Sequence, residues 1–350
     1  MKFDLSDDQA LLRDSTRDFL HNESPLETSR QIMEHDARGY DAAVWMRLAE
    51  MGYLSLLTPT AAGGQGLGAV ELAVVLEEMG RVCFPGPYLD VVLAAHLLAG
   101  ADANHPLVGA ITNGSSLVTI ARQDTAFSGA SAPAVAITHA HARGVKHFVP
   151  FAEHADALLV VVDDGVVFCR SPFAVTPMPT FDPAQRFCKV TFDHPATPAA
   201  TLEGLRLTDQ LAAIGASAML LGIMSRALDV TLGYVQTRHT FKRPIGAFQA
   251  LQHRLADMLL KVESTRSAVY RAAWCFDAHD PDAHLATAVA KAYAGDASRL
   301  VCGEAIQMHG GIGFTWELDL HFLFKRAKTL EQHYGSTEEQ LERALAATAY

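Results

Sequence analysis

The chain has 350 residues, of which 49% are hydrophobic, so it is long enough for two or three domains with sizeable cores. Its 28 basic and 39 acidic side chains give a net charge of −11, which argues against a nucleic-acid partner. The longest nearly uncharged apolar run, 211–224, is too short to cross a bilayer, and the first residues do not resemble a signal peptide, so we expect a soluble cytoplasmic protein without membrane insertion.

The first hundred residues follow helical patterns. Ser6 and Gln9 have the spacing of a capping box at the start of one helix. A second helix is expected from an Asp41 cap to a stop at Gly52. Two further helices are expected over 70–79, ended by Gly80, and over 88–98.

From about residue 115 the period changes to that of β-strands. Short segments rich in branched residues occur at 116–120, 134–138 and 188–192. The runs 157–162 and 166–169 flank an Asp164-Gly165 turn, a strong signal for a β-hairpin. These features predict an antiparallel β domain of roughly 85 residues.

Helical patterns return at about residue 207. The stretch 211–232 is apolar nearly all round, as expected for a central helix, and 247–273, 283–309 and 318–333 are its predicted partners in a four-helix bundle. The predicted fold is therefore mainly α with a central antiparallel β domain. Its expected domains are 1–112, 113–200 and 201–350.

Several common functional motifs are missing or incomplete. Residues 64–69 fit GxGxxA, but no second parallel strand follows, so a loop is the better interpretation. The 16 histidines form no HExxH pair, and the five widely spaced cysteines indicate neither a zinc site nor a disulfide framework. The histidine and cysteine patterns therefore predict no metal. No GxSxG motif supports acyl transfer by a serine nucleophile.

The stretch 238–249 joins two long predicted helices and concentrates hydrogen-bond donors beside aromatic rings. The donors are Arg238, Thr240 and Gln249, and the rings are Phe241 and Phe248. Such a turn could bind a flat anionic ligand, with the guanidinium on a pyrophosphate and a ring available for stacking. A surface loop with an ion-paired arginine is the alternative interpretation.

Two motifs in the right order resemble one family. Residues 238–249 are similar to the R-x-x-F-x-x-x-I-x-x-F-Q signature of acyl-CoA dehydrogenases, and 306–314 resemble that family's IQxxGGxGF segment. Alone, the second motif could equally be a helix C-cap followed by a tight turn. The resemblance implies an N-terminal helical domain, a β barrel or sandwich and a C-terminal four-helix bundle.

The resemblance also implies FAD, held between subunits of a dimer or of a dimer of dimers. The residues expected to contact the FAD of the neighbouring subunit are Arg238, Thr240, Phe241, Phe248 and Gln249. Those expected at its adenosine and pyrophosphate end are Gln307, Gly310 and Gly311. Ser336 matches a family threonine near the flavin.

The resemblance implies the reaction of this family's enzymes. A carboxylate removes the α proton of an acyl-CoA while the β hydrogen is transferred to FAD as a hydride, which yields the enoyl-CoA. The usual position of that base corresponds to Tyr334, and the alternative position, 26 residues before Arg238, corresponds to Ala212. Tyrosine is a poor base at neutral pH. Asp209, three residues before Ala212, is a candidate for a relocated base, because on a helix it would face nearly the same side. The alternative interpretation is an acidic residue near the N-terminus of the helix that interacts favourably with the helix dipole.

These observations lead to three hypotheses. The first is a flavin-binding subunit of a heteromeric acyl-CoA dehydrogenase, because residues 315–321 resemble the bacterial branch that oxidises steroid side-chain CoA thioesters with two kinds of subunit. The second is a self-sufficient dehydrogenase, active as a homo-oligomer with a relocated base. The third is a flavin-free acyl-CoA-binding or assembly protein. The expected partners are an acyl-CoA, a second subunit or another copy of the chain, and an electron-transfer acceptor.

Overall fold

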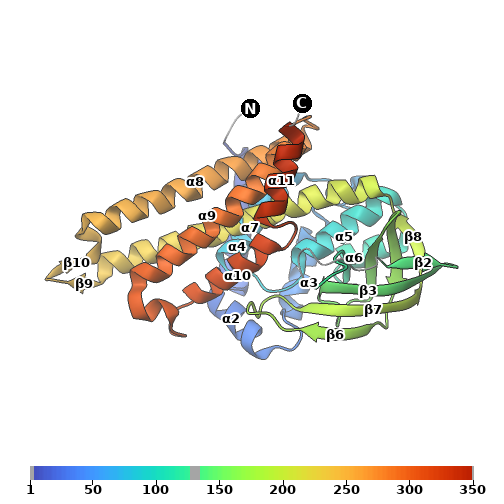
Figure 1. Cartoon of the computed structure of the whole chain (residues 1–350), viewed down its shortest axis with the longest axis horizontal. Helices are drawn as coiled ribbons and strands as arrows, with labels where there is room; N and C mark the ends of the chain where they lie inside the picture. Colours follow the sequence, from blue (N-terminus) through green and yellow to red (C-terminus); the bar gives the residue numbers. More distant parts are fainter. Residues whose placement is uncertain (1–3, 127–134, 349–350) are drawn as a thin grey trace. The chain divides into compact units, whose positions relative to one another are not determined.

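The computed structural model describes residues 4–126 and 135–348, which form two compact units. Of the described residues, one unit contains 4–31, 69–84 and 213–348, and the other contains 32–68, 85–126 and 135–212. Each unit is thus assembled from segments distant in sequence, which can be followed by colour in Figure 1. The division into domains at 112 and 200 remains a prediction.

The N-terminal region is helical, as the sequence predicts. Ser6 and Gln9 form both hydrogen bonds of the capping box, and the Asp41 carboxylate accepts from the backbone N–H groups of Ala43 and Val44. The helices α2 and α6 were not predicted. The helices are α1 (Asp7–Glu23), α2 (Leu26–His35), α3 (Ala42–Glu50), α4 (Ala69–Arg81), α5 (Tyr88–Ala101) and α6 (Pro106–Thr112), with 3₁₀ turns at Tyr53–Ser55 and Thr60–Ala62.

The β region forms two four-stranded sheets within the second unit. Their strand orders are β1-β4-β5-β8 and β2-β3-β7-β6. The strands are β1 (Val118–Ala121), β2 (Ala136–Thr138), β3 (His141–Pro150), β4 (Ala157–Val162), β5 (Gly165–Arg170), β6 (Ala174–Met178), β7 (Phe187–Pro195) and β8 (Thr197–Ala200). The buried Thr119 hydroxyl of β1 donates to the Pro150 carbonyl of β3 at 2.8 Å, which ties one sheet to the other.

One strand pair departs from the predicted antiparallel arrangement. The β4–β5 hairpin is confirmed, with Val162 opposite Gly165 across the turn, whereas β1 pairs with β4 in parallel. No hairpin turn joins β1 to β4, so tertiary packing rather than local turn chemistry sets their direction. Of the segment expected over 134–138, residue 134 lies outside the described residues and 136–138 form β2.

The C-terminal region contains the four predicted helices and one more. The helix α9 has the predicted bounds, Ala283–His309, and packs against α8, α10 and α11. Figure 1 shows α7, α8 and α9 as long, roughly aligned helices of this region. The bounds are α7 (Leu202–Thr237), α8 (Gln249–Asp277), α10 (Leu320–Gln332) and α11 (Thr337–Thr348), the last of which was not predicted.

The helix α7 has 36 residues and is long and apolar enough to cross a membrane by length and composition alone. However, 94% of its most apolar window is buried inside the protein. Burial on all sides is the pattern of a central core helix, which is the role that the sequence predicts for it.

Two glycines allow α4 and α7 to cross at close range. A Cβ on Gly80 would collide with the Met219 carbonyl, and a Cβ on Gly222 would collide with the carbonyl of Glu77. Gly80 was expected to end its helix, but α4 continues through it to Arg81. This glycine is required for interhelical contact and not for termination, which a sequence pattern alone does not distinguish.

We expect Gly222→Ala to destabilise the protein by about 2–3 kcal/mol, because the added methyl group meets backbone that cannot rotate away. Gly233→Ala is the matched control, since it lies on the same helix and its Cβ would meet nothing within 4 Å. That control should be neutral or stabilising by up to about 1 kcal/mol, from helix propensity. Denaturant unfolding measures both, and equal stabilities of the two variants would contradict the close crossing.

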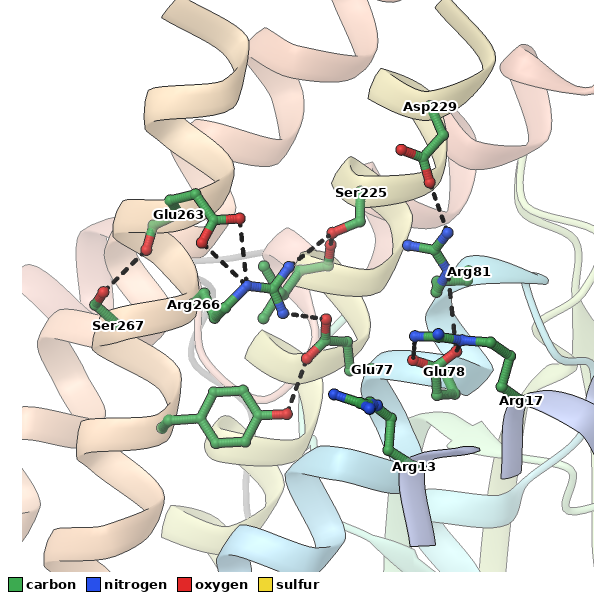
Figure 2. A network of polar contacts seen from close by, with 12 residues as sticks. Arg13, Arg17, Glu77, Glu78, Arg81, Ser225, Asp229, Glu263, Arg266 and Ser267 are labelled. Carbon is green, nitrogen blue, oxygen red and sulfur yellow. Dashed lines mark hydrogen bonds and ion pairs between the residues drawn. The ribbon is translucent and has the colours of Figure 1, made fainter. Parts of the chain in front are cut away.

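Beside this crossing, α4 carries two buried carboxylates that are both paired. Glu77 forms an ion pair with Arg266 of α8 and accepts a 2.9 Å hydrogen bond from the Tyr270 hydroxyl. Glu78 accepts two hydrogen bonds from the Arg17 guanidinium of α1, at 2.7 and 3.0 Å. Figure 2 shows the guanidinium groups of Arg266 and Arg17 beside Glu77 and Glu78 of α4. Removing one partner of a buried pair leaves an uncompensated charge, so this network fixes which faces of α1, α4 and α8 meet.

Candidate functional site

The stretch 238–249 folds into a short hairpin between α7 and α8. Strands β9 (His239–Thr240) and β10 (Arg243–Pro244) pair antiparallel around Phe241 and Lys242, whose φ angles are 49° and 64°. Two-residue hairpin turns with two positive φ angles usually contain Asn and Gly. Two larger residues in this conformation are strained, and such strain concentrates at functional sites.

The hairpin displays its aromatic and cationic groups on the surface. Phe241 is 86% exposed, and its ring lies edge-on to that of Phe248 at a centroid distance of 6.4 Å. The Arg243 guanidinium lies 4.1 Å from the Phe248 ring centroid. The sequence analysis did not predict a site role for Arg243. Its position between Phe241 and Phe248 in the sequence could have indicated one. An exposed ring of this kind can stack on a planar ligand.

The predicted donors of this stretch remain available. Arg238, Thr240 and Gln249 are exposed, and within residues 4–126 and 135–348 their side chains make no hydrogen bond or ion pair. The alternative of an ion-paired surface arginine therefore does not hold for Arg238 in the described part of the chain. An unpaired guanidinium next to a hairpin that exposes an aromatic ring fits a ligand that has both a phosphate and a planar group.

The glycine motif follows the end of α9 and contains three glycines with different roles. Gly310 caps the helix with a φ of 63°, and Gly313 packs so closely that a Cβ would meet the Ile306 carbonyl at 2.5 Å. Gly311 has neither constraint, because its φ is not left-handed and a Cβ there would enter open space. A glycine that the fold itself does not require fits close approach of a ligand to the backbone. Gln307, one turn earlier, is exposed.

A contact between helix ends brings the hairpin and the glycine motif together. Tyr234, one turn before the hairpin, stacks on His309 with ring centroids 4.1 Å apart, and its hydroxyl donates to the His309 carbonyl at 3.4 Å. His309 is buried, and burial lowers the pKa of its imidazole, so the stacked ring is neutral at neutral pH. The sequence does not predict this contact, because the two residues are 75 positions apart and lie on different helices.

Ser336 lies in the turn between α10 and α11, where its hydroxyl has a structural role. It accepts from the Glu339 backbone N–H at 3.2 Å, and the Glu339 carboxylate accepts from the Ser336 N–H at 3.0 Å. This is a capping box for α11. The hydroxyl hydrogen is not used in that bond, so the predicted flavin contact from Ser336 remains a prediction.

Asp209 forms an ion pair with Arg122, with 2.9 Å between carboxylate oxygen and Nε. It lies in the third turn of α7, too far from the helix start for the helix dipole to account for it, so that alternative interpretation was wrong. The side chain is 41% exposed. The carboxylate is therefore engaged by a guanidinium of the β unit.

Neither of the two positions at which the sequence resemblance places a base holds a carboxylate. Ala212 is buried, at 1% exposure, and has no titratable group. Tyr334 has a φ of 63° in the turn before Ser336. Within the described ranges, no cluster of three or more His, Cys, Asp or Glu side chains could hold a metal ion.

In the β unit, a buried lysine secures the loop after β1. Lys146 is fully buried and pairs with the Asp124 carboxylate at 2.6 Å, while its ammonium also donates to the Arg122 carbonyl. Burial lowers the pKa of Lys146, and its pairing with Asp124 opposes that shift. Nearby, Phe148 has a φ of 49° at an irregularity in the β3–β7 pairing. The loop 122–125 is thus rigidly held.

Comparison with known proteins identifies relatives along the whole chain. Residues 6–103 match the acyl-CoA dehydrogenase N-terminal domain, and 210–348 match the acyl-CoA dehydrogenase C-terminal domain. Acyl-CoA dehydrogenase IpdE2 of Mycolicibacterium smegmatis is 32% identical over 340 residues, covering 97% of this chain and 98% of that protein.

Two solved structures resemble the chain closely. One belongs to the ChsE4-ChsE5 complex of Mycobacterium tuberculosis, with a TM-score of 0.90, 27% identity and full coverage of both chains. The other is a variant of the Tcur3481-Tcur3483 steroid ACAD, with a TM-score of 0.88, 27% identity and 97% coverage of both chains. The likeness confirms the predicted fold class.

We expect Arg238→Ala to weaken FAD binding by about 10- to 100-fold, the usual effect of losing a hydrogen bond to a charged group. Arg271→Ala is the control, because Arg271 is also exposed and, among the described residues, makes no side-chain hydrogen bond or ion pair. A flavin-fluorescence titration measures both dissociation constants. Equal affinities of the two variants would remove Arg238 from the site.

Proposed function

Because the chain belongs to the acyl-CoA dehydrogenase family, we propose that it is the FAD-binding subunit of a heteromeric enzyme in which a partner subunit supplies the catalytic base. The reaction is the α,β-desaturation of an acyl-CoA thioester. The observation that carries the proposal is the combination of a preserved cofactor-recognition surface with the absence of a carboxylate at both positions where the family resemblance places the base.

The recognition surface consists of free groups at one end of the helical unit. Arg238 would pair with the pyrophosphate, Phe241 would stack on a planar part of the cofactor, and Gly311 would let the backbone approach it. The chemistry that FAD would supply when bound is acceptance of the hydride that leaves the β carbon. The described side chains at 212 and 334 offer no carboxylate for the α proton, so a carboxylate of the partner would receive it.

The relatives support both the partner and the class of substrate. The ChsE4-ChsE5 and Tcur3481-Tcur3483 structures are named for two proteins each, and the second is called a steroid ACAD. We therefore propose that the partner is a second acyl-CoA dehydrogenase subunit and that the substrate is the CoA thioester of a steroid side chain. The electron acceptor would be an electron-transfer protein, and the location the cytoplasm.

The test is to purify the chain alone and co-expressed with a candidate partner, a second acyl-CoA dehydrogenase subunit from the same genome that carries the base glutamate. We expect turnover of a steroid-type acyl-CoA only from the co-expressed pair, because loss of a positioned base lowers the rate by about 10²- to 10⁴-fold. As control, the pair is made with the partner's base glutamate changed to Gln, which should abolish turnover while flavin stays bound. Full activity of the chain alone would refute the proposal.

The first alternative is a self-sufficient enzyme that uses Asp209 as a relocated base. Since Asp209 is paired with Arg122, we expect Asp209→Asn to leave kcat unchanged and to cost at most about 1 kcal/mol of stability. If turnover by this variant instead fell by about a hundredfold or more while its flavin content stayed normal, the alternative would be favoured.

The second alternative is a flavin-free acyl-CoA-binding or assembly protein. The unpaired donors at 238–249 and the open backbone at Gly311 argue against it, because the fold itself uses neither feature. An absorption spectrum of the protein purified with its partner decides between them. A colourless complex that still binds the thioester would support this alternative.

A further inference from the structure

The turn between α10 and α11 has an unusual backbone held by buried side chains. Tyr334 and Gly335 are consecutive residues with φ angles of 63° and 98°. A Cβ on Gly335 would collide with the amide of Gln340, whose Nε2 donates to the Tyr334 carbonyl at 3.2 Å. Gln340 is 1% exposed. Gln340 of α11 therefore helps to hold the backbone of this turn in its observed conformation.

The second support of this turn is Lys291 of α9, which is fully buried. Its ammonium donates to the Glu331 carbonyl at 3.1 Å and to the Gly335 carbonyl at 2.8 Å. Glu331 is in the last turn of α10, where carbonyls have no partner within the helix. One cation thus holds the backbone on both sides of Tyr334.

A buried ammonium is a costly way to end a helix. Water or a glycine cap can satisfy terminal carbonyls without removing a charge from solvent. Burial lowers the pKa of Lys291 to about 8, and the charged groups that face it are Glu331 of α10 and Glu339 and Arg343 of α11. Capping of α10 alone therefore does not explain the lysine. Its contacts with both carbonyls also fix the position of the turn after α10.

The position enforced is next to the proposed cofactor site. Ser336 follows Gly335 directly, and Tyr334 occupies the place of the family's base. Lys291 lies on α9, sixteen residues before Gln307, so the same helix carries the lysine, Gln307 and the glycine motif. A straight helix keeps these groups at a fixed separation.

We propose that Lys291 is a positioning residue, which ties the Tyr334–Ser336 turn to α9 and so holds Ser336 in register with Gln307 and Gly311 for flavin binding. The inference rests on the proposed function only in taking the flavin to lie beside this turn. It needs neither the partner's base nor turnover, so its test is independent of both.

The experiment compares Lys291→Met with Lys189→Met, the same substitution at an exposed position of β7, in the flavin-containing complex and in the chain alone. We expect Lys291→Met to accelerate amide hydrogen exchange at 334–336 by at least tenfold, to leave exchange in α7 and α8 unchanged, and to weaken FAD binding by about tenfold. Uniformly faster exchange across the helical unit would overturn the proposal, because it would mean a general loss of stability. Unchanged exchange at 334–336 would overturn it too.

A second measurement needs no substitution, in case Lys291→Met does not fold. In the unmodified protein, loss of the ammonium's proton weakens both carbonyl contacts, so exchange at 334–336, corrected for its intrinsic pH dependence, should accelerate and FAD affinity should fall as the pH rises through about 8. Where Lys291→Met folds, this transition should be missing from it and present in Lys189→Met. A pH-independent affinity and corrected exchange between pH 7 and 9.5 in the unmodified protein would contradict the assignment.

Discussion

The close crossing of α4 and α7 is the constraint on which the helical unit depends. Gly222 removes the side chain that would separate the two backbones, and Gly80 does the same from the other helix. At that distance α4 turns its two carboxylates toward α8 and α1, where Arg266 and Arg17 pair with them. Close backbone contact on one side of α4 and the pairing of its buried carboxylates on the others favour a single orientation of this helix.

The recognition groups lie at helix ends, and this placement follows from the packing of the helices. Most of the central part of α7 is buried, and α9 has a long buried face, so many of their side chains belong to the core. Arg238 directly follows α7 and Gln307 is in the last turn of α9, and both are exposed. The stack of Tyr234 on His309 links the two segments, so a contact within the fold contributes to the geometry of the proposed ligand site.

Under the proposed function, cofactor recognition and proton abstraction would be divided between two subunits. Tyr334 and Ala212 are at the two positions where the family resemblance would place a carboxylate, and Asp209 is paired with Arg122. The turn around Tyr334 nevertheless keeps its supports, because Lys291 and Gln340 bind backbone carbonyls, which any residue at 334 would offer. These hydrogen bonds to the main chain therefore do not depend on the side chain at 334. This is consistent with a subunit that retains cofactor binding while a partner performs proton abstraction.

The sequence by itself determined the features that depend on neighbours along the chain. The Ser6 capping box, the Asp41 cap, the β4–β5 hairpin and the bounds of α9 all follow from local capping, turn chemistry and periodicity. The two cofactor motifs were also recognisable, because each is one short continuous segment. Tertiary structure alone decided the parallel pairing of β1 with β4 and the interhelical role of Gly80. It also decided the ion pair of Asp209 with Arg122 and the hydrogen bonds of Lys291 to the Glu331 and Gly335 carbonyls. Each of these joins residues far apart in sequence, and no local pattern specifies which distant group a strand, glycine or charge will meet.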